Sequence, residues 1–146
     1  MSFSIHSFRR LPLAYSLGFW LLIPFLALIS GPVYAEWVLV SVVDQAGVTI
    51  YVDPDTIHRK GDRVEVLELI DYRTRQTVRG TSFLSARVQR EYDCAGDRHR
   101  TLALTRLSGQ MATDEAIPAN ADQPKWEPVD PGTIAKRLWK VACKKQ

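Results

Sequence analysis

The first 35 residues of this chain have the layout of a secretory signal peptide, and this layout decides which part of the chain is left to fold. Arg9 and Arg10 form a positively charged start, and residues 11–29 are almost wholly apolar. The Ser-Gly-Pro sequence at residues 30–32 breaks any helix, and residues 33–35, Val-Tyr-Ala, place small side chains at the two positions that a signal peptidase reads. The domain that folds is therefore expected to be an exported one.

Cleavage between Ala35 and Glu36 leaves a domain of 111 of the 146 residues, at positions 36–146. An uncleaved membrane anchor is the alternative, because the apolar run of 19 residues is long enough to span a bilayer. Pro24 within that run and the small residues at the cut favour cleavage, and no cysteine lies near the cut to be lipidated. We expect the protein in the periplasm or at the cell surface, in contact with a membrane only through the signal segment.

Cys94 and Cys143 are the only two cysteines, and export would place both in an oxidising compartment. An even number of cysteines in an exported domain predicts a disulfide, which here closes a loop of 50 residues from 94 to 143. Chain entropy gives such a loop about 4 kcal/mol of stabilisation. A metal site would need further clustered ligands, and a redox pair would be separated by two residues. Neither pattern is present, so a structural disulfide is predicted.

Runs rich in β-branched and aromatic residues, separated by turn signals, predict an antiparallel sheet. The turn at residues 95–97, Ala-Gly-Asp, joins two of these runs as a hairpin. Proline cannot donate to a strand ladder, so the sequence Asp-Pro-Asp at residues 53–55 is expected to end the second strand after Val52. Residues 73–80 are polar and cationic and are expected to form an exposed loop, as is the stretch 108–124. The predicted strands are residues 37–43, 48–52, 64–72, 81–94 and 98–107, with a short edge strand near Trp126.

The C-terminal segment changes from strand to helix periodicity. Asp130 is a good N-cap, and Pro131 would occupy the favoured first helical position. Ile134, Leu138 and either Val141 or Ala142 then recur at a spacing of three to four residues, which places them on one helix face. A helix of about three turns is marginal alone, so it must pack on another element.

The two cysteines indicate what this helix covers. Cys94 ends a predicted strand and Cys143 ends the helix, and bridged Cα atoms lie within about 7 Å of each other. The helix must therefore lie across the sheet face to which Cys94 points. Arg90 is a charged residue on a face that is otherwise expected to be apolar. Its side chain would either extend past the helix edge or pair with a carboxylate. Trp126 and Trp139 are expected in the core between helix and sheet, because they bring the largest apolar area.

Few residues have the pattern of a catalytic or metal site. Asp53 and Asp55 flank Pro54, where aspartates usually form turns rather than acid–base pairs or cation sites. His58 and His99 have no third ligand at a suitable spacing and are expected to be exposed. After removal of the signal the domain has 17 basic and 16 acidic residues, a net charge of +1, which gives no reason to expect a nucleic-acid partner. No enzyme activity, metal or cofactor is predicted.

One group of arginines is a candidate ligand-binding site. Residues 58–106 contain 11 basic residues against seven acidic ones. Arg73, Arg75 and Arg79 share the predicted loop, and guanidinium groups suit carboxylate, sulfate or phosphate groups. The pattern favours a solvated strand surface that discourages edge-to-edge aggregation. The functional alternative is a protein or polyanionic surface ligand that binds at these three side chains.

Several short motifs occur in the order and spacing of a known family. They are Tyr-Val-Asp-Pro-Asp-Thr-Ile at 51–57, Glu-Tyr-Asp-Cys at 91–94, Ser-Gly-Gln-Met at 108–111, Trp-Glu-Pro at 126–128 and Leu-Trp-Lys-Val-Ala-Cys at 138–143. Over about residues 37 to 143 the chain thus resembles the bacterial surface-adhesin protein E family. The resemblance implies a curved antiparallel sheet with a C-terminal helix tied to its concave face by a disulfide. It also implies a cell-envelope protein, in a family whose named member binds host matrix and serum proteins.

The predicted fold class is therefore α+β, a curved antiparallel β-sheet of about five to six strands with one C-terminal helix packed on one face and tethered by a disulfide. The predicted function is an exported, non-enzymatic, adhesin-like binding module of the bacterial cell envelope. The alternative is a periplasmic structural or assembly factor that contacts other envelope proteins.

Overall fold

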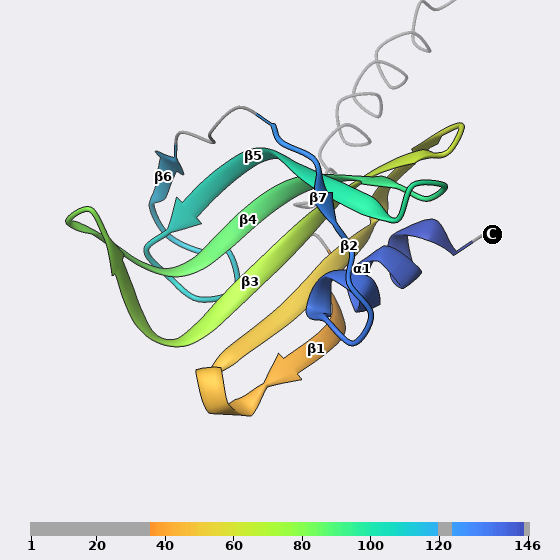
Figure 1. Ribbon diagram of the computed structural model, residues 1–146. Coiled ribbons are helices and arrows are strands. Elements are labelled where there is room, and N and C mark those ends of the chain that lie inside the picture. Colours follow the sequence, from red (N-terminus) through yellow and green to blue (C-terminus); the bar gives the residue numbers. More distant parts are fainter. Residues whose placement is uncertain (1–35, 120–123, 145–146) are drawn as a thin grey trace, which may run out of the picture. The chain divides into compact units, whose positions relative to one another are not determined.

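The computed structural model describes residues 36–119 and 124–144, which form one curved antiparallel sheet and one α-helix (Figure 1). The predicted signal segment, residues 1–35, lies outside the described residues. The elements in chain order are β1 (Val38–Val43), a short 3-10 helix (Asp44–Ala46), β2 (Val48–Lys60), β3 (Arg63–Val78), β4 (Thr81–Asp93), β5 (Arg98–Leu107), β6 (Ala116–Ala119), β7 (Glu127–Pro128) and α1 (Ile134–Cys143).

The strands β1 to β6 are neighbours in the order in which they follow one another along the chain. Strand β7 pairs with the start of β5, at Arg98 and His99, whereas β6 pairs with its end. All pairs are antiparallel. The predicted fold class is confirmed, because the sheet is curved and open and one C-terminal helix is tethered to it by a disulfide. The seventh strand is the four-residue β6, which lies in the stretch 108–124 that was predicted to be a loop. The two-residue β7 is the short strand that was predicted near Trp126.

Strand β2 was predicted to end after Val52 because of Pro54, but it continues to Lys60. The register between β2 and β3 shifts between Asp53 and His58, so Pro54 lies where the regular ladder is interrupted. A proline at such a bulge removes no ladder hydrogen bond. The side-chain oxygen of Thr56 accepts the amide of Leu67 at 2.9 Å in place of a backbone partner. The strand therefore resumes beyond the bulge and runs on to its hairpin with β3.

The predicted exposed loop at residues 73–80 is also wrong, because β3 continues through most of it. Only Arg79 and Gly80 form the turn to β4, and both have left-handed backbone angles, with φ of 50° and 79°. The two strands stay paired up to this turn, where the hydroxyls of Thr77 and Ser82 lie 3.0 Å apart. Polar side chains on both faces hid the strand, since neither face of this end is covered enough to impose an apolar alternation.

Helix α1 packs on the concave face of the sheet (Figure 1). Leu138 and Ala142 lie four residues apart on one face of the helix and are both buried. Burial of this face supplies the stability that a helix of ten residues lacks alone. The core between the helix and the sheet consists of Ile50, Val52, Val64, Val66, Tyr92, Leu138 and Ala142.

The N-cap of α1 is Thr133 and not Asp130, as had been predicted. The hydroxyl of Thr133 accepts the amide of Lys136 at 3.2 Å. Asp130 contributes its backbone carbonyl, which accepts the hydroxyl of Thr133 at 2.6 Å and forms a turn before the helix. Gly132 has a left-handed φ of 80°, so the chain is not yet helical there. Asp130 and Thr133 are both suitable N-cap residues, and only the backbone geometry decides between them.

The disulfide joins the end of β4 to the end of the helix. Cys94 directly follows the strand, Cys143 is the last helical residue, and their Cα atoms lie 5.6 Å apart. Beside it, the indole nitrogen of Trp139 donates to the carbonyl of Asp93 at 3.3 Å. Trp139 also packs against the core, as predicted. The covalent link and this hydrogen bond fix the last turn of the helix against the strand ends.

Candidate functional site

The three predicted ligand-binding arginines lie at the end of the β3–β4 hairpin, and we call Arg73, Arg75 and Arg79 the arginine arm. All three side chains are exposed. Arg73 lies 3.7 Å from the carboxylate of Asp44, and both of these side chains are mostly solvent-exposed. Such exposed pairs contribute only about 0–1 kcal/mol, so this contact does not remove Arg73 from other partners. The hairpin places the three exposed cations at one end of the sheet (Figure 1).

The base of the arginine arm is stiffened by aromatic contacts that the sequence analysis did not find. The rings of Tyr72 and Phe83 meet edge to face, with centroids 5.7 Å apart. The guanidinium carbon of Arg106 lies 5.3 Å from the centroid of Phe83. Burial raises the pKa of Tyr72 above its ordinary value of 10.0, although the charge of Arg106 opposes the rise. The phenol is therefore neutral at physiological pH.

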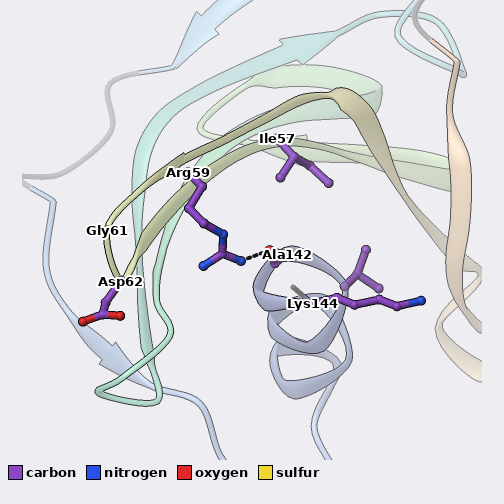
Figure 2. A pocket seen from close by; sticks show the side chains of 7 residues that line it. Ile57, Arg59, Gly61, Asp62, Ala142 and Lys144 are labelled. Carbon is purple, nitrogen blue, oxygen red and sulfur yellow. Dashed lines mark hydrogen bonds between the residues drawn. The ribbon is translucent and has the colours of Figure 1, made fainter. Parts of the chain in front are cut away.

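A second candidate is the hairpin–helix cleft, an open cavity of about 760 Å³ between the β2–β3 hairpin and the last turn of α1. Figure 2 shows Arg59 crossing from the hairpin to the helix, where its Nη2 donates to the carbonyl of Ala142 at 3.4 Å. The other terminal nitrogen of Arg59 lies 4.0 Å from the sulfur of Cys94. The residues that line this cleft are Ile57, Arg59, Gly61, Asp62, Val141, Ala142 and Lys144.

No sequence signal could have found the hairpin–helix cleft. Its two walls come from residues 57–62 and 141–144, which are about 80 positions apart. They meet because the disulfide and the apolar face of α1 hold the end of the helix beneath the hairpin. Neither wall has a recognisable binding motif of its own.

A third feature is the buried charge cluster, formed by Glu68, Arg90, Tyr92 and His99 on the concave face. Glu68 is fully buried, and Arg90 Nε donates to its carboxylate at 2.9 Å. The hydroxyl of Tyr92 donates to the other carboxylate oxygen of Glu68. Arg90 was predicted to be a charged residue on the sheet face that the helix covers. It pairs with a carboxylate rather than extending past the helix edge.

Burial changes the protonation of this cluster. Removal from water raises the pKa of Glu68 above 4.5, while the charge of Arg90 and the Tyr92 hydrogen bond oppose the rise. Burial, and then the charge of Arg90, lower the pKa of His99 below 6.5, against a smaller opposite effect of Glu127. Neutral His99 accepts from Arg90 at Nδ1 over 3.0 Å. His99 is therefore buried and not exposed, which corrects the prediction.

The buried charge cluster joins β3, β4 and β5 to one another. Every buried side-chain nitrogen and oxygen in the described part of the chain has a hydrogen-bond partner. A network with all its donors and acceptors satisfied stabilises one arrangement of strands. We therefore assign this cluster a structural role.

Trp126 lies against three arginines and not in the core between helix and sheet, which corrects a second prediction. The guanidinium carbons of Arg63, Arg98 and Arg100 lie 4.6, 4.9 and 4.7 Å from the centroid of its ring. Arg100 and Arg63 in turn pair with Glu91. The indole therefore fastens the segment before β7 to the surface of the sheet by cation–π contacts.

The remaining polar residues that the sequence analysis considered do not converge. The carboxylate of Asp53 accepts the amide of Asp55 at 3.1 Å, which is a turn contact. His58 is exposed on β2, far along the chain from the buried His99. Within residues 36–119 and 124–144, no group of three or more histidine, cysteine, aspartate or glutamate side chains is arranged to hold a metal ion. In this same part of the chain no helix has the length and apolarity needed to cross a bilayer.

Comparison with known proteins gives one sequence match and several structural ones. A family model described as Surface-adhesin protein E matches residues 37–144. No curated protein matches the chain.

The structural matches include structures of Haemophilus influenzae protein E. Its crystal form II is 12% identical with a TM-score of 0.59, covering 72% of this chain and 86% of that chain. Another structure of the protein is 14% identical with a TM-score of 0.60, covering 76% of this chain and 86% of that chain. Protein E from non-typeable Haemophilus influenzae is 11% identical with a TM-score of 0.56, and the match covers 72% of this chain and 74% of that chain. At these identities the likeness shows a shared fold.

Proposed function

Because this chain belongs to the surface-adhesin protein E family, we propose that it is a non-enzymatic, adhesin-like binding module exported to the bacterial cell envelope. Residues 1–35 are removed between Ala35 and Glu36 during export, and the domain described above performs the binding. Its ligand is a polyanion displayed on a surface, which it contacts through the arginine arm. The observation that supports this choice is the exposure of all three arginines at one hairpin end.

The arginine arm is well placed to meet a large partner. Figure 1 shows the β3–β4 turn at the opposite end of the sheet from α1, so a ligand there need not disturb the helix or the disulfide. Guanidinium groups bind sulfate and carboxylate groups with two parallel hydrogen bonds. Because the side chains are exposed, the attraction is screened by salt, and the affinity should fall as the ionic strength rises.

Chromatography on immobilised heparin tests this proposal. The purified domain should stay bound at physiological salt, about 150 mM. The variant Arg73→Gln/Arg75→Gln/Arg79→Gln should elute at clearly lower salt. The matched control loses three exposed cations elsewhere, as Lys60→Gln/Lys125→Gln/Lys140→Gln, and should elute close to the wild type. Equal elution of the arm variant and the wild type would contradict the proposal.

A second candidate is a periplasmic assembly factor, and strand β1 favours it. This strand is at the edge of the sheet, and three of its apolar side chains are about half exposed: Val38 (45%), Leu39 (55%) and Val42 (47%). An exposed apolar edge can accept an extended segment of another envelope protein as an added strand. Protease added to intact cells separates the two candidates, since a surface adhesin is cleaved and a periplasmic factor is protected.

A further inference from the structure

We infer that the hairpin–helix cleft is a binding site for an aliphatic carboxylate, with the carboxylate at Arg59 and the hydrocarbon chain against Ile57 and Val141. The cleft lies at the end of the sheet opposite the arginine arm, so this inference does not depend on the proposed polyanion site (Figure 1). Its volume of about 760 Å³ falls within the range of about 300–1,000 Å³ that small-molecule sites occupy.

The head of the ligand is recognised by Arg59. A guanidinium has five N–H donors, and the contacts with the Ala142 carbonyl and the Cys94 sulfur engage only some of them. The contact with the carbonyl has a second effect, because the end of α1 carries a partial negative charge that repels anions. By donating to that carbonyl, Arg59 offsets the repulsion at the point where a carboxylate would bind.

The body of the ligand is recognised by two aliphatic side chains. Figure 2 shows Ile57 directed from the hairpin toward the space above the helix. Val141 lines the same space and is 38% exposed, which is high for a valine on a helix that packs on a sheet. A hydrocarbon chain between these residues would remove apolar surface from water on both sides.

The shape and charge of the cleft favour a ligand with one charged end. Arg59 bridges from hairpin to helix, so a chain that ends there fits, whereas one that runs through the cleft does not. Lys144 lies on the far side of the helix end from Arg59, and Asp62 lies at the tip of the hairpin (Figure 2). With two cations against one carboxylate, the lining attracts an anion rather than a cation.

Calorimetric titration with sodium decanoate, below the concentration at which it forms micelles, tests the inference. We expect saturable binding, with amide shifts at Gly61 and Ala142 in the NMR spectrum. Arg59→Gln should weaken binding about tenfold, because a charge-assisted hydrogen bond is lost. Ile57→Ser should also weaken binding, because it removes an apolar side chain that would contact the hydrocarbon chain. The matched control is Lys60→Gln, which removes a cation next to Arg59 that does not line the cleft and should leave the affinity unchanged.

Arg59 also contacts the end of α1, so the Arg59→Gln variant must first show the circular dichroism and melting temperature of a folded domain. If it does not fold, Ile57→Ser and Val141→Ser decide the question. Absence of saturation by decanoate, or unchanged affinity in the folded cleft variants, would overturn the inference. So would equally tight binding of decyltrimethylammonium, or tighter binding of a short peptide that ends in leucine.

Discussion

Replacement of Arg90 by methionine should destabilise the domain much more than the loss of a surface cation would. Methionine keeps a long flexible stem that can fill the same space but removes the charge. Glu68 is fully buried, and Arg90 Nε lies 2.9 Å from its carboxylate. The variant therefore leaves a buried carboxylate whose remaining side-chain donor is the hydroxyl of Tyr92.

The size of the effect follows from the geometry of this pair. At 2.9 Å and an effective dielectric constant of about 20, the gross attraction between the two charges is about 6 kcal/mol. Removal of one partner from a buried ion pair typically costs about 3–5 kcal/mol. The side chain of Arg90 is 17% exposed, and Tyr92 still donates to Glu68 in the variant. These two factors reduce the loss of stability. We expect the free energy of unfolding to fall by about 3 kcal/mol at neutral pH.

The loss should depend on pH in a defined direction. Burial raises the pKa of Glu68 above 4.5, and Arg90 opposes this rise, so the variant raises that pKa further. A carboxyl group whose pKa is higher in the folded state makes its full contribution to stability below the unfolded value. This contribution is lost as the pH rises through the folded value. The difference between variant and wild type should therefore shrink as the pH falls from neutral toward 4.5.

Urea unfolding, followed by tryptophan fluorescence at several pH values, measures this difference. The control is Arg87→Met, which removes a half-buried arginine from the other face of β4 and should change the stability by about 0.5 kcal/mol or less. A loss of less than about 1 kcal/mol for Arg90→Met at neutral pH would mean that Arg90 does not neutralise a buried Glu68 carboxylate, because an unpaired buried charge costs more. An equal loss at pH 4.5 and at neutral pH would refute the role of Glu68.

Four further changes test other parts of the structure. Cys143→Ser should lower the free energy of unfolding by about 4 kcal/mol, measured against the oxidised wild type in urea, because it opens a loop of 50 residues. Trp126→Ala should lower it by about 2 kcal/mol through lost cation–π contacts, and an unchanged urea midpoint would count against them. Because the pKa of His99 is lowered in the folded state, the unfolded chain takes up a proton at a higher pH than the folded domain does. The free energy of unfolding should therefore fall as the pH drops below 6.5, and His99→Gln should remove this contribution to its pH dependence. Thr133→Ala should destabilise the domain by about 1 kcal/mol, and by more than Asp130→Ala, because only the threonine caps the helix with its side chain.

The fold was predictable where a strong local signal agreed with a long-range constraint. The turn at residues 95–97 lies between two apolar runs, and both runs are strands of one hairpin. The periodicity of Ile134 and Leu138 identified the helix. The cysteine pair then indicated which face of the sheet the helix covers, because a bridge limits the distance between the two ends.

The errors arose where local chemistry had more than one solution. Pro54 ends a regular strand but is compatible with a bulge, and the register shift that creates the bulge involves residues on two strands. Asp130 and Thr133 are both suitable N-caps, and the turn between them decides which is used. Local sequence does not determine such choices, because the partner strand or the preceding turn makes them.

The candidate binding features were less accessible from the sequence than the fold. The three residues of the arginine arm were selected from the basic composition of residues 58–106 and from a shared predicted loop, although Arg73 and Arg75 lie on β3 and Arg79 lies in the turn that follows it. Pairing of Arg90 with Glu68 required the register of β3 against β4, which places Glu68 opposite Val88 and diagonal to Arg90. The hairpin–helix cleft required the position of α1 as well. Each of these depends on contacts between segments that are distant in the sequence.

We propose that the arginine arm attaches the cell to a polyanionic surface, and this claim predicts how many whole bacteria a heparin-coated surface retains. Cells that display the wild-type protein and cells that display the control with Lys60, Lys125 and Lys140 replaced should be retained alike. Cells that display the variant with Arg73, Arg75 and Arg79 replaced should fall to the level of cells without the protein. Equal retention of the arm variant and the wild type, at equal surface amounts, would contradict the claim.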